Sequence, residues 1–148
     1  MGNPAKAAKF TEEARKLDLA DRYLNAHSSK YLFKNDKIQQ ANETMALFSK
    51  DQDCEKLNVH EMSTFWYEVH CGMSNFRQGN YRLALKEFSY FEKHFNLMGE
   101  DCLDFFYCSM RRCTLLHYLD MWKWQNNIHQ GKWAVRGCVK LLKVLKRI

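Results

Sequence analysis

The residues of this sequence that could act as nucleophiles, general bases or metal ligands are its six histidines and six cysteines. No two cysteines form a C-x-x-C pair, and no histidine has the spacing of a zinc motif. His70 and Cys71 suggest a Cys/His nucleophile, but neighbouring residues of a helix point to different faces. A glycine-rich phosphate loop, a GxSxG motif and an HExxH motif are absent. The sequence predicts packed or surface histidines, no catalytic centre and no metal site.

The cysteines are predicted to be free thiols in a reducing compartment. Several fall on apolar faces of expected helices, where cysteine acts as a small hydrophobic residue. The sequence shows no signal peptide and no apolar run of transmembrane length. We therefore expect a cytoplasmic protein without membrane contact, and a disulfide framework is the less economical alternative.

The clearest binding chemistry lies in the last 17 residues, KWAVRGCVKLLKVLKRI, which carry six basic residues and no acidic one. At helical spacing one face is basic, and it consists of Lys132, Arg136, Lys140, Lys143 and Arg147. The opposite face is apolar, and it consists of Ala134, Cys138, Leu141, Leu142, Leu145 and Ile148. Two interpretations stay open. The basic face is either the solvated side of a packed helix or a contact for RNA, ribosome, membrane or an acidic partner.

Helices must position these residues. The chain has 148 residues, of which 46% are hydrophobic, so it can bury a core. One proline and six glycines leave little material for the turns of a strand-rich fold. Leu, Ala, Lys, Glu, Arg and Met fill most segments and favour helix. The sequence predicts an all-α fold.

The stretch RQGNYRLALKEF, residues 77–88, indicates how the helices are arranged. Tetratricopeptide repeats have about 34 residues in two antiparallel helices, with small and bulky residues at fixed positions. If Ala84 is placed at a small position, Gly72 occupies the other small position, and Tyr81 and Phe88 occupy bulky ones. We expect Gly72 to permit close approach of the two helices and Gly79 to form the corner between them.

The same pattern recurs earlier, with Ala41 and Ser29 at the small positions and Ala7 located 34 residues before Ala41. The chain is therefore expected to begin inside a repeat, as an excerpt of a longer array. The polar segment SKDQDCEKLN accounts for a longer step from Ala41 to Ala84. We predict one helical repeat domain over 1–148: a truncated repeat over 1–20, repeats over 22–50 and 59–96, and a divergent helical pair over 100–148.

The divergent pair is expected to start with a long helix over residues 101–126, whose buried stripe includes Leu115, Leu119 and Trp122. A turn around His129 to Gly131 then leads to the basic helix. Because a helical pair cannot bury its face alone, neighbouring pairs are predicted to stack. The expected architecture is a tetratricopeptide-repeat-like right-handed superhelix, an α-α solenoid fragment.

The first helix of each repeat is expected to line the concave surface. One repeat contributes Tyr23, Ala26, His27, Lys30, Phe33 and Lys34, and the next contributes Trp66, Val69, His70, Met73, Phe76 and Arg77. This aromatic and modestly basic mixture suits an apolar peptide segment or a phosphate-rich anion. The candidate partner-binding residues are Lys34, Trp66, His70, Phe76 and Arg77, and ordinary solvated charge is the alternative for each lysine. A carboxylate clamp of the co-chaperone type is excluded, because its positions hold Ala26, Lys30 and His70.

Several segments follow one another in a specific order: EARKLDLADRYLN, KYLFKND, LNVHEMSTFWYE, GNYRLALKEFSYFEKHF and DCLDFFYCSMRRCTLLHYLDMWKW. In this order and spacing they resemble the auxiliary (large) subunit of the NatA N-terminal acetyltransferase complex. The resemblance covers nearly all 148 residues. The sequence departs from the family at Trp122, Trp124 and Trp133, and it lacks a proline near Gly131.

The resemblance implies a non-catalytic scaffold that wraps the catalytic subunit and helps to tether it to the ribosome near the nascent-chain exit. The acetyl-coenzyme-A loop of acetyltransferases is absent, in agreement with a non-catalytic role. Family members also bind inositol hexakisphosphate, and the family's Lys-Tyr pair in that pocket matches Lys30 and Tyr31. This ligand is not a required cofactor.

Two functions are therefore carried forward. The first is an auxiliary subunit of an N-terminal acetyltransferase complex, and the second is a generic tetratricopeptide protein- or peptide-binding module. Nucleic-acid contact through residues 132–147 would fall steeply with salt and fits ribosome association, with no direct sequence-specific recognition.

Overall fold

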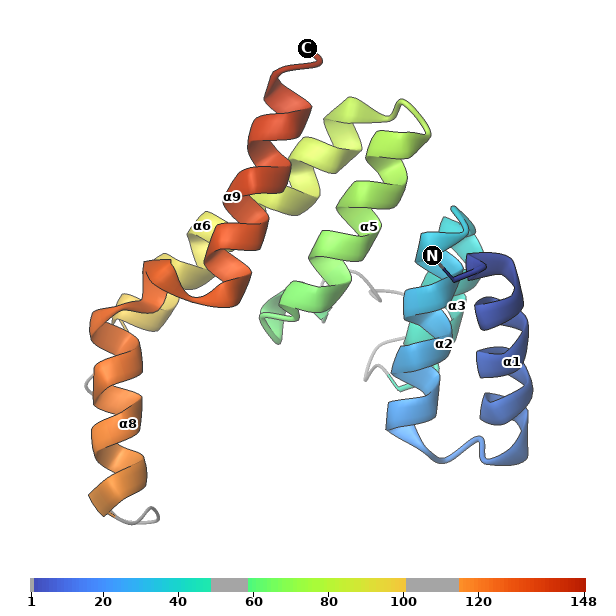
Figure 1. Ribbon diagram of the computed structural model, residues 1–148, viewed down its shortest axis with the longest axis horizontal. Coiled ribbons are helices and arrows are strands. Elements are labelled where there is room, and N and C mark those ends of the chain that lie inside the picture. The colour runs from blue at the N-terminus through green and yellow to red at the C-terminus, as the bar shows by residue number, and fades with distance from the viewer. Residues whose placement is uncertain (1, 49–58, 101–114) are drawn as a thin grey trace.

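The computed structural model describes residues 2–48, 59–100 and 115–148, and the regular elements in these ranges are all helices (Figure 1). They are α1 (Pro4–Leu17), α2 (Arg22–Lys34), α3 (Ile38–Ala46), α5 (Phe65–Arg77), α6 (Tyr81–Glu100), α8 (Leu115–Asn126), the 3-10 turn η2 (Ile128–Gln130) and α9 (Lys132–Leu145). The all-α prediction is confirmed. So is the predicted turn before the basic helix, because η2 and Gly131 separate α8 from α9. The expected helix over 101–126 is described only from Leu115 onward.

The helices form antiparallel hairpins that stack side by side (Figure 1). In the stack α1 packs on α2, α2 pairs with α3, α5 pairs with α6, and α9 packs on both α5 and α6. Side-chain caps set two of the starts, because Asn3 accepts from the amide of Ala5 at 3.0 Å and Asp21 accepts from the amide of Tyr23 at 2.7 Å. This arrangement is the solenoid that the repeat pattern predicts, and it places α2, α5 and α9 next to one another.

The second hairpin is closed by the small residues that the repeat predicts. A Cβ atom on Gly72 would lie 2.8 Å from Cζ of Phe88, so only glycine permits the observed approach of α5 to α6. Ala84 is fully buried beside Phe88 in the same core. Gly79 has φ of +80°, the left-handed conformation that the corner needs. The predicted roles of Gly72 and Gly79 are confirmed.

The two hairpins are joined by the corner residue Asp36, which also has a positive φ, of 61°. Its carboxylate accepts from Ser74 at 2.8 Å and from Nε of Arg77 at 2.9 Å. Arg77 also donates to the carbonyl of Phe33 at 2.8 Å. Arg77 therefore links the C-terminal end of α5 to the preceding hairpin.

Helix α9 lies against α6 with a face that matches the expected one only in part. Its buried residues are Ala134, Gly137 and Val144, while Leu142 and Leu145 are more than half exposed. A Cβ atom on Gly137 would lie 2.5 Å from Cδ1 of Phe91, so glycine allows the two helices to touch. The predicted apolar face is therefore only partly right. Ala134 is buried and Leu141 packs against the core of α6, but Cys138, Leu142, Leu145 and Ile148 are exposed, because the close approach at Gly137 sets the orientation.

The apolar residues of helix α8 are more exposed than the sequence predicts. The sequence pattern predicts that Leu115, Leu119 and Trp122 belong to a buried stripe, but their side chains are 72%, 39% and 50% exposed. The helix has no buried residue, and it extends away from α5 and α9 (Figure 1). Its apolar residues have no core to join within the part of the chain that the structure describes.

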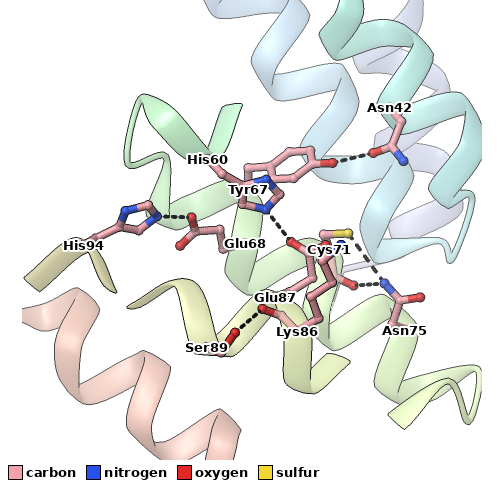
Figure 2. Close-up of polar contacts among 10 residues, drawn as sticks. All are labelled: Asn42, His60, Tyr67, Glu68, Cys71, Asn75, Lys86, Glu87, Ser89 and His94. Carbon is pink, nitrogen blue, oxygen red and sulfur yellow. Dashed lines mark hydrogen bonds and ion pairs between the residues drawn. The ribbon is translucent and has the colours of Figure 1, made fainter. Parts of the chain in front are cut away.

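A polar network is buried where the segment before α5 meets α6 (Figure 2). His60 bonds to Glu87 at 3.0 Å, and His94 bonds to Glu68 on one side and to Ser63 on the other. Burial, reinforced by the charge of Glu87, raises the pKa of Glu68 to about 8, while burial lowers the pKa of His94. At neutral pH the Glu68–His94 pair thus holds one proton between two buried side chains. Both histidines are packed, as the sequence predicts.

Within the described ranges, none of the helices is long and apolar enough to cross a lipid bilayer.

Candidate anion-binding site

A cavity of about 500 Å³ lies between α2, α5 and α9. It is lined by Lys30, Lys34, Val69, His70, Trp133, Val135, Arg136, Val139 and Lys140. Four of these residues are cationic and none is acidic. The volume falls within the range of about 300–1,000 Å³ that is typical of small-ligand sites.

Helical spacing brings the four cations to one place. Lys30 and Lys34 are four residues apart on α2, and Arg136 and Lys140 are four residues apart on α9, so each pair shares a helix face. His70 lies between the pairs, on the neighbouring helix α5. Within the residues that the structure describes, none of the four cations forms an ion pair. Their charges are therefore left for an external anion.

The pKa of His70 reflects its surroundings in the cavity. Burial lowers the pKa of His70 to about 4, and repulsion from Lys30, Lys34, Arg77 and Arg136 adds to the effect. The imidazole is therefore neutral at pH 7, mainly because burial disfavours its charged form. The four lysine and arginine side chains of the lining, with no acidic lining residue beside them, give the cavity its positive charge.

Lys140 responds in the same direction. Burial lowers the pKa of its ammonium group, and the charges of Lys143, Arg136 and Arg77 lower it further. Such like-charge crowding costs free energy unless an anion offsets it. Crowded, unpaired cations around a cavity are typical of phosphate-binding sites.

The remaining walls of the cavity are apolar. Val69, Trp133, Val135 and Val139 surround the charged groups, and the guanidinium of Arg136 lies 5.2 Å from the centre of the Trp133 ring. Val135 and Val139 are 50% and 44% exposed, so the cavity opens to solvent on the α9 side. The arrangement favours a compact, highly charged anion held by several helices at once.

The structure brings together residues that the sequence placed in separate groups. Lys30, Lys34 and His70 come from the predicted concave face, and Arg136 and Lys140 come from the predicted basic face. Tyr31 does not line the cavity, but its ring lies 4.6 Å from Nζ of Lys34 and so supports that side chain. The sequence pattern places Lys140 on the basic face of its helix, and the structure places it half-buried in the cavity wall.

Other candidate residues have structural positions instead. Trp66 packs against the core formed by Leu32, Phe33 and Tyr67, and Phe76 packs against Tyr81 at 5.6 Å between ring centres. Arg77 is ion-paired with Asp36 at 2.6 Å, so it contributes to the potential without lining the cavity. These three residues are therefore not brought to the cavity.

The outer residues of the basic helix also lie elsewhere. Lys132, Lys143 and Arg147 are exposed and do not line the cavity. Sequence reasoning missed Trp133, Val135 and Val139 as cavity walls. Helix α9 carries two apolar stripes with the same helical spacing, one that packs on α6 and one that lines the cavity. Periodicity cannot tell the two stripes apart, so the cavity walls could not be recognised from the sequence.

A larger hollow of about 780 Å³ lies along the two hairpin corners. It is lined largely by amide side chains, and its charged residues, Asp36, Lys37 and Glu43, are of both signs. It has no concentrated charge, so the smaller cavity is the stronger candidate.

Comparison with known proteins identifies similar chains. The family model described as "N-terminal acetyltransferase A, auxiliary subunit" matches residues 1–144. The chain is 37% identical, over 96% of its length, to the N-terminal acetyltransferase A complex auxiliary subunit NAA15 of Arabidopsis thaliana. It is 35% identical, over 82% of its length, to the human N-alpha-acetyltransferase 16, NatA auxiliary subunit. The matched regions are 16% and 14% of those relatives, so the chain spans about a sixth of their length.

A solved structure shares the fold. The "Structure of Naa15/Naa10 bound to HypK-THB" contains a chain that superposes with a TM-score of 0.82 and 30% sequence identity. The match covers 97% of this chain and 22% of the other.

Proposed function

Because the chain belongs to the family of N-terminal acetyltransferase A auxiliary subunits, we propose that it is a non-catalytic scaffold segment which organises the catalytic subunit around a bound polyanion. The observation that carries this proposal is the cavity formed by α2, α5 and α9, which has four cations without an ion pair and no acidic lining residue among the residues that the structure describes. A solenoid segment without a catalytic constellation is suited to holding other molecules.

The proposed ligand is inositol hexakisphosphate. Its phosphate groups surround a compact ring, so one molecule can contact cations on three sides of a cavity. Lys30 and Lys34 would hold it from α2, and Arg136 and Lys140 from α9. Such a ligand offsets the repulsion between the helices and stabilises their stacking; it takes no part in chemistry.

The proposed protein partner is the catalytic subunit of the acetyltransferase. In the similar solved structure, Naa15 is present together with Naa10. Helix α9 exposes an apolar stripe that consists of Leu142 and Leu145 beside the cavity and of Val135 and Val139 at the cavity's edge. An exposed apolar stripe beside a charged cavity supports a protein contact at this place.

The exposed cations Lys132, Lys143 and Arg147 support association with the ribosome near the nascent-chain exit, through backbone phosphates rather than base sequence. We propose a cytoplasmic location and no membrane contact for the same assembly.

The second candidate function is a generic peptide-binding module. It draws support only from the partly aromatic concave face. It does not explain the unpaired cations.

Co-expression of the 148-residue chain with the catalytic subunit of NatA is expected to give a co-purifying complex. Replacing Leu142 and Leu145 with aspartate places two charges on the apolar stripe of α9 and is expected to weaken the complex at least about tenfold. The matched control replaces Leu115 and Leu116 of α8, which are 72% and 74% exposed, with aspartate and leaves binding unchanged. Elution of the two wild-type proteins apart, measured by size-exclusion chromatography, would contradict the scaffold proposal.

A further inference from the structure

Among the residues that line the cavity, His70 has the side chain whose ordinary pKa lies closest to neutral pH. The charged groups that face it are Lys30 and Lys34 from α2, Arg136 and Lys140 from α9, and Arg77 from its own helix. In the described part of the chain no acidic residue lines the cavity, and Asp36 is engaged with Arg77. The imidazole is half-buried among cations, and it would be the natural donor to an anion that filled the space.

We propose that a polyanion enters this cavity together with one proton, which His70 takes up to become a fifth cationic ligand. This inference deepens the anion-binding function proposed above and rests on it. An anion reverses the sign of the potential at the ring, so the charged imidazole becomes the favoured form. The protonated ring then donates from both nitrogens, whereas the neutral ring donates from only one.

The direction of the pH dependence follows from linkage. The pKa of His70 is about 4 in the cavity without an anion, and a bound anion moves it upward. Binding therefore takes up a proton at every pH between about 4 and the raised value, and affinity increases as the pH falls through that window. One coupled proton limits the slope to about tenfold per pH unit. Below the pKa of the free cavity, His70 is charged in both states and contributes no slope.

The test uses inositol hexakissulfate, whose sulfate groups stay ionised throughout the titration, so protons gained on binding belong to the protein. The ring resonance of His70, assigned with His70→Gln, is followed by NMR from pH 4 to 9 with and without saturating ligand. We expect the pKa of the ring to rise from about 4 by about three units or more on binding. Titration calorimetry is expected to show wild-type affinity rising about tenfold from pH 7.5 to 6. In His70→Gln the change is expected to stay below about twofold.

His129→Gln is the matched control, because His129 is an exposed histidine outside the cavity. It should keep the wild-type pH dependence. The site-specific ring signal separates His70 from Lys140, whose ammonium also faces the anion. If the wild type binds but the pKa of the His70 ring stays near its unliganded value, the proton coupling is wrong and the anion site stands. If the wild type fails to bind inositol hexakissulfate at any pH, the anion-binding function itself is wrong.

Discussion

Replacing Lys30, Arg136 and Lys140 together with alanine is expected to weaken inositol hexakisphosphate binding by about a hundredfold or more. The three side chains approach the cavity from α2 and α9, and none is ion-paired within the described residues. A charge-assisted contact that is partly exposed contributes about 1 kcal/mol. Three such contacts contribute about 3 kcal/mol, which corresponds to about a hundredfold in Kd. Calorimetric titration at 0.15 M salt measures the effect.

The matched control removes the three cations of the basic face that do not line the cavity, Lys132, Lys143 and Arg147. Its net charge equals that of the cavity variant, so any difference between the two reports position rather than charge. These three side chains are exposed and do not line the cavity, so salt at 0.15 M screens their charges more than those of the cavity, and we expect less than about a threefold loss. Equal losses in both variants would show that the anion binds along the whole basic face of α9 and that the cavity is not the site.

Replacing Gly137 with leucine is expected to displace α9 from α6. The position of the new Cβ atom lies 2.5 Å from Cδ1 and 2.8 Å from Cε1 of Phe91, whose ring is only 5% exposed and cannot move aside freely. Overpacking of this kind costs about 1–3 kcal/mol. For a chain of this size each kcal/mol lowers the Tm by about 3–4 °C. We expect a fall in Tm of about 3–12 °C on thermal unfolding.

The same variant is also expected to lose anion affinity, although it retains every cation of the cavity. Arg136 and Lys140 flank the altered position along α9, and displacing the helix moves both of them. Gly99→Leu is the control, because Gly99 is helical and a Cβ atom there meets nothing within 4 Å. That change should stabilise the helix slightly, since leucine has the higher helix propensity. If Gly137→Leu also raised the Tm, the close contact between α9 and Phe91 would be wrong.

The local parts of this fold could be predicted from the sequence. Gly72, Ala84 and Phe88 occupy repeat positions whose packing depends on spacing within one hairpin, and the structure confirms their contacts. The corner at Gly79 is equally local, because its positive φ favours glycine.

The orientation of α9 could not be predicted in this way. Its apolar residues cover more than half of its circumference, since Val135, Val139, Leu142 and Leu145 are exposed while Ala134 and Val144 are buried. Periodicity alone cannot choose between two apolar stripes. The choice depends on Phe91, which lies 46 residues earlier and meets the helix at Gly137.

The candidate site could be predicted only in pieces, for the same reason. Lys30 and Arg136 are more than a hundred residues apart, and only the stacking of α2, α5 and α9 brings them to one cavity. Arg77, by contrast, has the right position in its repeat to face a ligand. The partner of Arg77, Asp36, lies 41 residues away on another helix hairpin. The spacing of residues within one helix therefore cannot predict that Arg77 is engaged in this ion pair.

Hydrogen–deuterium exchange with and without inositol hexakisphosphate tests most directly whether three helices distant in sequence form one anion site. We predict slower exchange in α2, α5 and α9 together, with no change in α1 or α8, because only the first three line the cavity. Protection confined to α9, with α2 and α5 unchanged, would contradict the three-helix site and reduce it to a basic helix.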